Sequence, residues 1–302
     1  MTTTAWEAID PFGPCQAGVY RDAHVEVRAH LGSLPRRGLH TVRTEHFDVT
    51  PFESRLQVVH RVPREQIDDD VSGLLATELF QPGWLRGPEL FERLFTGVVL
   101  SSDPDPLEAW TRFYRNTTAR IEASLDGSGS GSSHGTVADY APVYGIAERS
   151  LAPGTVLELG CCFGFLSLRL AAAGRPVLAT DVSPGTIGLL AAVAPRLGVE
   201  VATHVTDAAR LPWAAGTADN VLAVHLLEHL DADHGARVLA EAVRVARRRV
   251  VVAVPLEDEA DETWGHVRTV SLADLDAWGA ATGLPYDVRD DHGGWLIVHT
   301  SR

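Results

Sequence analysis

The sequence contains no lysine: all 26 of its basic residues are arginine. Without a lysine amine the chain cannot form a Schiff base with a carbonyl substrate, and it lacks the lysine with which a nucleotide P-loop holds phosphates. Lysine-assisted hydride transfer is excluded for the same reason. The three cysteines, Cys15, Cys161 and Cys162, are too few for a disulfide framework or a four-cysteine zinc site. We therefore expect reduced thiols.

The sequence also has little positive charge and no long apolar run. Its formal net charge of −14 argues against a nucleic-acid partner, because affinity for phosphates comes from clustered basic residues. The longest apolar runs, such as Val250 to Leu256, are far shorter than the roughly 20 residues that cross a bilayer. The opening residues, MTTTAWEAIDPFGP, lack the pattern of a secretory signal. We expect a cytoplasmic protein without a membrane partner.

One low-complexity segment, DGSGSGSSHG from Asp126 to Gly135, has the composition of a flexible linker. It predicts an N-terminal unit over residues 1–126, a linker over 127–135 and a second domain over 136–302. In the first unit, apolar and polar residues alternate in 39–49 and 54–62, which predicts a pair of strands. Apolar residues at helical spacing follow, and we interpret their stripe as the core face of a helix in a small α+β unit: Leu107, Trp110, Tyr114, Ile121 and Leu125.

After the linker, short apolar segments alternate with helical stretches. Five of them predict strands buried on both faces: 155–159, 177–180, 199–205, 220–224 and 250–254. Ser183 and Pro184 supply a helix cap and a first-turn proline, and Gly198 closes that helix. This order of elements predicts a doubly wound parallel sheet.

The end of the chain predicts a different kind of strand pairing. Residues 286–289 and 295–298 have strand composition, and only five residues separate them. A parallel crossover needs a dozen residues or more. The last strand must therefore run antiparallel to its neighbour.

A glycine-spaced turn, Glu158-Leu-Gly160-Cys-Cys162-Phe-Gly164, follows the first of these strands. The dinucleotide fingerprint G-x-G-x-x-G would need glycine at positions 160, 162 and 165, and only the first is present. Because cysteine is small, Cys162 can keep the turn tight while Cys161 packs as a buried apolar residue. We assign neither thiol a chemical role.

Four segments in order, with the terminal hairpin, resemble the class I S-adenosylmethionine-dependent methyltransferases of the type 11-like group over about residues 137–300. The turn matches the acidic-x-Gly-x-Gly-x-Gly loop of that family, with Cys162 in place of the middle glycine. The other segments are VLATDVSPG, THVTDAARLPW and ADNVLAVHLLEHL. The resemblance implies a Rossmann-like seven-stranded sheet with an antiparallel last strand, and S-adenosyl-L-methionine as cofactor.

The resemblance also implies roles for individual residues. Asp181 would accept hydrogen bonds from both ribose hydroxyls, and Asp207 would accept one from the adenine amino group. The full set of implied cofactor residues is Glu158, Gly160, Cys162, Gly164, Asp181, Val182, Asp207, Ala208 and His225. We expect Tyr140, Tyr144 and Trp264 to contact the acceptor.

Methyl transfer from a sulfonium is an in-line displacement, so positioning supplies most of the catalysis, but a hydroxyl acceptor must also lose its proton. The candidates for this general base are His229, His266 and Glu228, and a purely structural role for either histidine stays open. His225 to His229 spells H-x-x-E-H, the spacing of an inverted zincin helix. Because His225 ends a predicted strand, we expect no metal there.

We therefore expect a methyltransferase that acts on a hydroxyl of a small molecule or an oligosaccharide. The chain is similar to a sub-family of methyltransferases that act on the oligosaccharide of the redox cofactor mycofactocin. The similarity lies in the long N-terminal unit and in the segments YAPVY and WGHVRTVSLADL. One alternative is a non-catalytic scaffold that binds the cofactor without turnover, because the middle glycine is missing. An NAD-dependent oxidoreductase is a further alternative, disfavoured by the failed fingerprint.

Overall fold

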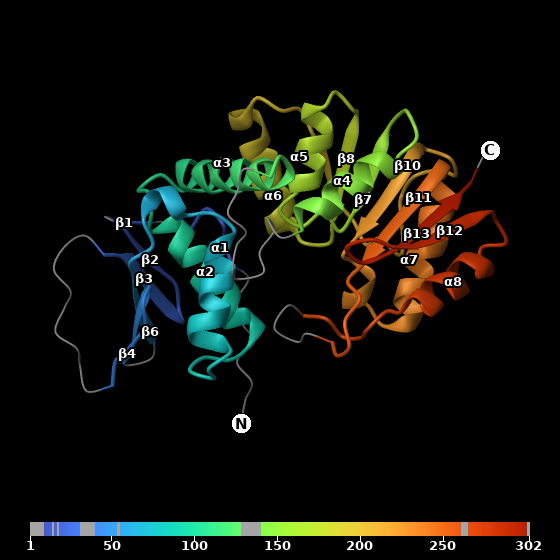
Figure 1. Cartoon of the computed structure of the whole chain (residues 1–302). Helices are drawn as coiled ribbons and strands as arrows, with labels where there is room; N and C mark the ends of the chain where they lie inside the picture. The colour runs from blue at the N-terminus through green and yellow to red at the C-terminus, as the bar shows by residue number, and fades with distance from the viewer. Residues whose placement is uncertain are drawn as a thin grey trace. The chain divides into compact units, whose positions relative to one another are not determined.

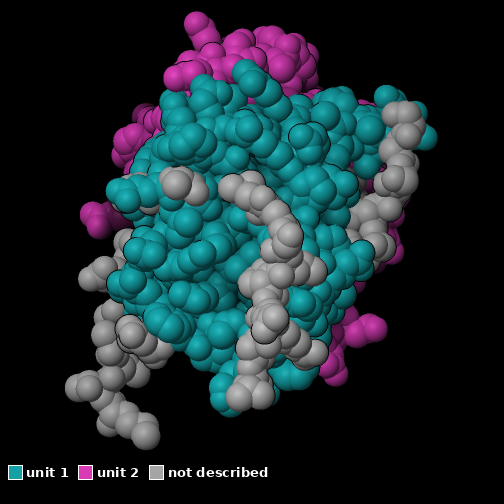
Figure 2. All heavy atoms as spheres, turned by 90° about the vertical axis from the view of Figure 1, so that its left-hand side faces the viewer, with its two compact units in different colours: residues 1–139 teal, residues 140–302 magenta. Residues whose placement is uncertain are grey.

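The computed structural model describes residues 9–13, 15–16, 18–30, 40–52, 55–127, 140–260 and 265–300 (Figure 1). The chain divides into two compact units, residues 1–139 and 140–302, which Figure 2 distinguishes by colour. The predicted linker over 127–135 lies outside the described residues except for Gly127. Within the described ranges, no helix has the length and apolar character needed to cross a membrane.

The first unit contains a six-stranded sheet in the order β1-β2-β3-β6-β5-β4. Strands β3 and β6 pair in parallel, whereas β5 and β6 pair antiparallel. The segment 54–62 forms β6 as predicted, whereas 39–49 contains β4 and the start of β5 in place of one strand. The strands are β1 (Cys15–Gln16), β2 (Val19–Arg21), β3 (Val25–Ala29), β4 (Val42–Arg43), β5 (Phe47–Phe52) and β6 (Arg55–His60).

The helical part of the first unit is η1 (Arg64–Gln66), α1 (Asp70–Leu75), η2 (Ala76–Phe80), α2 (Pro88–Leu100) and α3 (Pro106–Leu125). Helix α3 begins where the Asp105 side chain accepts a hydrogen bond from the Leu107 N–H. Its aromatic stripe is buried: Trp110 and Phe113 meet edge to face, as do Phe113 and Tyr114. The prediction that this stripe forms a core face is confirmed, and the unit is α+β.

The second unit is built on a seven-stranded sheet in the order β12-β13-β11-β10-β7-β8-β9. Strands β7 to β11 pair in parallel, and β13 runs antiparallel to both β11 and β12. The predicted doubly wound sheet with an antiparallel last strand is confirmed. Its strands are β7 (Val156–Leu159), β8 (Val177–Asp181), β9 (Ala202–Val205), β10 (Ala218–Val224), β11 (Ala246–Val254), β12 (Tyr286–Asp290) and β13 (Gly294–His299).

Helices cover both faces of this sheet (Figure 1). Helices α4 (Ala141–Ser150) and α5 (Phe165–Ala172) pack with Leu222 and Val251 in one apolar core. Helices α7 (Ala232–Val245) and α8 (Leu272–Ala281) pack on the opposite face with Val221 and Val250. Because side chains along a strand alternate between the two faces of the sheet, β10 and β11 contribute residues to both apolar cores. The remaining helices are α6 (Pro184–Val193), η3 (Ala194–Leu197) and η4 (Leu227–His229).

The start and surroundings of β9 differ from the prediction. We expected a strand over 199–205 buried on both faces, but β9 begins at Ala202 and its residues are mostly exposed. The reason is its place in the sheet: β9 is an edge strand with β8 as its partner. The preceding helix ends as predicted, with Ser183 capping α6 and Gly198 in the left-handed conformation after η3.

Candidate functional site

The parallel strands β7 to β11 all end at one edge of the sheet, which we call the carboxyl edge. In open α/β sheets, ligands bind just beyond this edge, where the strand order reverses. Here the reversal lies between β7 and β10, which are neighbours in the sheet but not in the sequence. The candidate site residues follow the strands at this edge.

The glycine loop that joins β7 to α5 has an unusual backbone. Gly160, Cys162 and Gly164 have φ values of 66°, 48° and 75°, so every second residue adopts the left-handed conformation. Glycine adopts this conformation without strain, whereas a residue with a Cβ does so at a cost. Cys162 stands at the position where the family pattern has its middle glycine, and its backbone adopts the left-handed conformation that glycine favours.

The two glycines are also required by close packing. A Cβ on Gly160 would lie 2.7 Å from Leu226 Cδ1, and a Cβ on Gly164 would lie 2.5 Å from Leu190 Cδ2. Both distances are too short for real carbon contacts. The loop is therefore pressed between the segment after β10 and helix α6.

The adjacent cysteines have different surroundings. Cys161 is buried and Cys162 is exposed, and no disulfide joins them to each other. Burial raises the pKa of the Cys161 thiol, so this side chain stays neutral. The expectation that Cys161 packs as a small apolar residue is confirmed.

Asp181, the last residue of β8, faces the glycine loop. Its Oδ2 accepts a hydrogen bond from the Cys162 N–H at 3.0 Å, and its Oδ1 accepts one from the Ser183 N–H at 2.9 Å. The next residue, Val182, leaves 71% of its surface exposed. A carboxylate and an open apolar side chain thus stand side by side at the carboxyl edge.

Asp207 and Ala208 follow β9. Asp207 Oδ1 accepts hydrogen bonds from the Ala209 N–H at 2.8 Å and from His234 Nε2 at 3.1 Å. The hydrogen bond from Ala209 is the main cause of the lowered pKa of Asp207, which favours the charged form. Ala208 packs at the margin of the core beneath α7.

Glu158 has a different environment from the other acids. Strand alternation turns it to the face covered by α5, where its carboxylate accepts a hydrogen bond from the Ser167 hydroxyl. Burial raises its pKa to about 7. The hydrogen bond from Ser167 joins the end of β7 to helix α5, on either side of the glycine loop. The role of Glu158 at the cofactor stays a prediction.

His225 directly follows β10 and has a φ of 51°. Its ring meets the Tyr140 ring edge to face, with 4.9 Å between centroids. Burial, with repulsion from His266 and His229, lowers the pKa of His225 to about 4, so the ring is neutral. Tyr144 packs against the core under α4. Trp264 lies outside the described residues.

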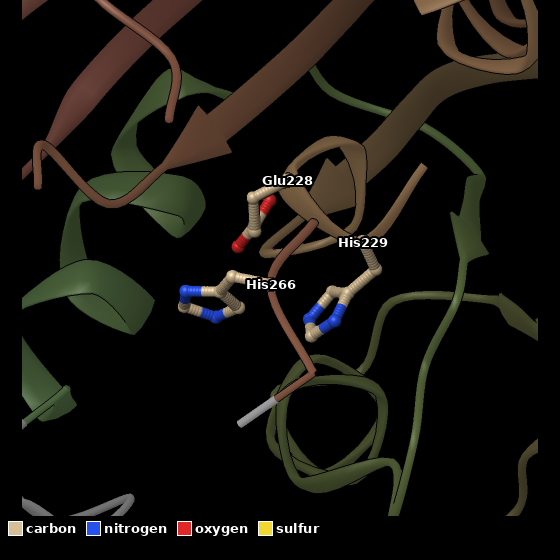
Figure 3. A group of neighbouring side chains, drawn as sticks. All are labelled: Glu228, His229 and His266. Atoms are coloured by element: carbon tan, nitrogen blue, oxygen red, sulfur yellow. The ribbon is translucent and has the colours of Figure 1, made fainter. Parts of the chain in front are cut away.

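The three predicted general-base candidates, Glu228, His229 and His266, form one group, which we call the histidine cluster. One nitrogen or oxygen atom from each lies within 4.8 Å of the others (Figure 3). The two imidazole rings meet at 4.9 Å between centroids. Burial raises the pKa of Glu228 to about 8, and partial loss of water lowers the pKa of His229. At neutral pH the cluster therefore contains a mostly protonated carboxyl and an uncharged imidazole.

Two segments far apart in the sequence build this cluster. Glu228 and His229 lie on η4, whereas His266 lies beyond β11. The Val267 N–H donates to the Glu228 carbonyl at 2.9 Å, and the Arg268 guanidinium donates to the Leu227 carbonyl at 3.0 and 3.2 Å. These hydrogen bonds hold the segments together independently of the cluster's side chains.

Sequence reasoning missed several supporting residues. Glu257 accepts a hydrogen bond from His266 Nδ1 at 2.8 Å, and Arg268 anchors η4. The signal for Glu257 was its position shortly after the fifth parallel strand. The contact of Leu226 with Gly160 had no signal in the sequence, because it depends on the pairing of β7 with β10.

Comparison with known proteins identifies the second unit. Residues 156–249 match the family model described as a methyltransferase domain. Residues 156–249 therefore carry a methyltransferase domain on the seven-stranded sheet, which supports the class I fold and the S-adenosylmethionine cofactor expected from the sequence. No curated protein matches the chain.

Several solved structures are similar to parts of the chain. The YcgJ protein from Bacillus subtilis is 20% identical over 49% of this chain and 70% of its own, with a TM-score of 0.43. A methyltransferase from Methanosarcina mazei is 17% identical over 51% and 96%, with a TM-score of 0.44. The magnesium protoporphyrin IX methyltransferase from Synechocystis PCC 6803, with bound S-adenosylmethionine, is 20% identical over 53% and 76%, with a TM-score of 0.41.

The chemistry of the carboxyl edge fits this cofactor. S-adenosylmethionine presents hydrogen-bond donors on its ribose, adenine and ammonium groups, and it carries a positive sulfonium. The edge presents the carboxylates of Asp181 and Asp207, and the exposed side chain of Val182 offers an apolar surface for a flat ring. The edge therefore offers hydrogen-bond acceptors of the kind that the donor groups of this cofactor require.

Proposed function

We propose that this protein transfers the methyl group of S-adenosylmethionine to a hydroxyl oxygen of a small molecule or glycan. The observation that carries the proposal is the histidine cluster, in which two imidazoles and a carboxyl group converge at the carboxyl edge. The link between the cluster and the glycine loop is short: Leu226 packs on Gly160, and Glu228 follows two residues later.

The residues at the carboxyl edge bind the cofactor. Asp181 accepts hydrogen bonds from the two ribose hydroxyls, and Asp207 accepts one from the adenine amino group. Val182 packs against the adenine ring, and the glycine loop with Cys162 lines the amino-acid end. When bound, S-adenosylmethionine supplies a methyl group on a positively charged sulfur.

The histidine cluster acts on the acceptor hydroxyl. The transfer forms an oxygen–carbon bond and breaks a carbon–sulfur bond, and the hydroxyl proton leaves. A carboxylate acceptor, which is already deprotonated at neutral pH, would need no proton acceptor. His229 is uncharged at neutral pH, since its pKa is lowered, so it has a lone pair to offer. His225 and Tyr140, packed ring to ring, form the neighbouring wall.

We further propose that the N-terminal unit, residues 1–126, selects the acceptor, and that a short linker over 127–135 joins it to the methyltransferase domain from residue 136. The resemblance to the mycofactocin sub-family makes that oligosaccharide the first acceptor to test. Tyr140, Tyr144 and Trp264 are the aromatic residues proposed to pack against its sugar rings.

The test is a methyl-transfer assay with isotope-labelled S-adenosylmethionine. The acceptors are the mycofactocin oligosaccharide, simpler glycosides, phenols, carboxylic acids and amines, and mass spectrometric fragmentation locates the methyl group. Label on a hydroxyl oxygen, lost in Asp181→Ala, supports the proposal. Label only on nitrogen or a carboxylate contradicts it. Tight cofactor binding without transfer to any acceptor supports the non-catalytic alternative instead.

A further inference from the structure

The histidine cluster has the composition of a metal site. Two imidazoles and one carboxylate are the protein ligands of many catalytic zinc sites, which keep a fourth position open. The same set also suits other divalent transition metals. In this chain, Glu228, His229 and His266 each offer one ligand atom within 4.8 Å of the others (Figure 3).

The hydrogen bonds around the cluster fix the tautomers of both histidines. His229 Nδ1 lies 3.2 Å from the Gly265 carbonyl oxygen, and His266 Nδ1 lies 2.8 Å from Glu257 Oε2. A carbonyl oxygen can only accept, so Nδ1 of His229 carries the hydrogen, and a carboxylate favours the same tautomer in His266. Each ring is left with a lone pair on Nε2. Metal-binding histidines are oriented by such bonds from the other ring nitrogen to a carbonyl or carboxylate.

The third member, Glu228, is buried without a partner. It is 1% exposed, and neither carboxyl oxygen has a hydrogen bond within the described part of the chain. Figure 3 shows its carboxyl group on the side of His266. Buried polar groups nearly always have partners, because an unpaired one costs stability. A cation held between Glu228 and the two imidazoles would provide that partner.

The separation of the ligand atoms is compatible with closure around an ion. Zinc bonds of about 2.1 Å place tetrahedral ligands about 3.4 Å apart, so ligand atoms 4.8 Å apart must approach by about 1.4 Å. His229 is exposed, so its ring has room to rotate. Hydrogen bonds from the Val267 N–H and the Arg268 guanidinium already hold the two segments together.

We propose that the histidine cluster binds one divalent transition-metal cation, Zn²⁺ in the first place, through the Glu228 carboxylate and Nε2 of His229 and His266. The remaining coordination position takes the hydroxyl oxygen of the acceptor, and this part rests on the proposed function. With the imidazole lone pairs bound, the cation activates the hydroxyl in place of His229: it stabilises the oxygen anion that forms when the hydroxyl proton leaves to solvent.

The proposed metal site differs from the sequence-based expectation of no metal at H-x-x-E-H. That expectation considered the H-x-x-E-H spacing on a single helix, and His225 in fact follows a strand and is not a member of the cluster. The third ligand is instead His266, which lies beside η4 in space although it is far from Glu228 in the sequence. The motif therefore contains two of the three proposed ligands, Glu228 and His229, but gave no indication of the third.

The experiment measures metal binding by the full chain without cofactor or acceptor. The protein is dialysed against a chelator and titrated with Zn²⁺ in competition with a chromogenic chelator, and Co²⁺ absorption reports the geometry. We expect one Zn²⁺ per chain. Glu228→Gln and His266→Asn should each weaken binding by more than tenfold, and Glu257→Gln by about tenfold through the orientation of His266. His292→Asn, at an exposed histidine paired with Asp291, should bind as the wild type does.

Circular dichroism and thermal unfolding check that each variant is folded. Absence of Zn²⁺ and Co²⁺ binding by the wild type, or equal affinity in folded Glu228→Gln, would overturn the proposal, as would binding of Mg²⁺ in preference to both. Methyl transfer is measured separately after chelation and after return of Zn²⁺. Undiminished transfer by the metal-free protein would overturn the role at the acceptor while leaving the proposed function intact.

Discussion

The Cys162 N–H donates a hydrogen bond to Asp181 Oδ2 at 3.0 Å, which joins the glycine loop to the end of β8. The bond exists because Cys162 adopts a left-handed backbone and Asp181 ends the neighbouring parallel strand. One carboxylate thereby holds the loop in place and faces the proposed ribose position. Loop conformation and cofactor binding should therefore be coupled.

Asp181→Ala should weaken the binding of S-adenosylhomocysteine by at least tenfold. The variant loses charge-assisted hydrogen bonds, each worth about 1.5 to 3 kcal/mol, and also the partner of the Cys162 N–H. Isothermal titration calorimetry measures the change. Asp290→Ala, at an exposed carboxylate ending β12, serves as the control. Equal affinity in the two variants would refute the assignment of Asp181 to the ribose.

Cys162→Gly should bind the cofactor about as well as the wild type and unfold with a free energy within about 1 kcal/mol of it. Glycine removes the strain of the left-handed backbone but loses more conformational entropy on folding, and the two effects oppose each other. Cys162→Val should be clearly less stable, because a β-branched residue is disfavoured at positive φ. Urea unfolding compares the three proteins. A valine variant as stable as wild type would argue against the loop conformation.

Gly164→Ala should destabilise the second unit by more than about 1 kcal/mol, because alanine disfavours a left-handed backbone. Its new Cβ would lie 2.5 Å from Leu190, at a φ of 75°. Gly188→Ala is the matched control, because it lies within α6 with nothing inside 4 Å of the added carbon. It should stabilise the helix by about 0.5 to 1 kcal/mol. Chemical denaturation should give opposite signs for the two substitutions, and the same sign in both would contradict the packing described.

Glu158→Gln should remove part of the pH dependence of stability. The pKa of Glu158 rises to about 7 in the folded protein, against an ordinary value of 4.5. Between these pH values the folded state holds a proton that the unfolded state releases, so stability falls as pH rises from about 4.5 to about 7. The loss is on the order of 3 kcal/mol.

Urea unfolding at several pH values tests this expectation. The glutamine variant should lack the decline, whereas Glu200→Gln, at an exposed glutamate, should follow the wild type. Parallel curves for wild type and Glu158→Gln would show that Glu158 titrates normally.

Much of the second unit could be predicted from the sequence, because its local signals agree with its fold. Central strands such as β10 and β11 are buried on both faces and form short apolar runs, and the five residues between the last two predicted strands exclude a crossover. The start of β9 was missed because the length of an edge strand depends on pairing with its single neighbour, here β8, and on where the chain leaves η3. Composition alone does not carry that information.

The site was less predictable than the fold. Motif order brought Asp181, Asp207 and His225 to the carboxyl edge, since parallel strands end together. The convergence of His266 on Glu228 depends on hydrogen bonds between segments about forty residues apart, such as that from Arg268 to Leu227. Cys162 was explained from the sequence by the small size of cysteine. Its positive φ is the more direct reason why the family usually has glycine at this position.

The central claim is that the carboxyl edge of the second unit binds S-adenosylmethionine. The most direct measurement is thermal unfolding of the full chain with S-adenosylmethionine, S-adenosylhomocysteine or NAD. A ligand at 100 times its dissociation constant adds about 2.7 kcal/mol to stability, which is readily seen as a higher unfolding temperature. We predict stabilisation by the two adenosyl sulfur compounds and none by NAD. Stabilisation by NAD alone, or by none of the three, would contradict the account.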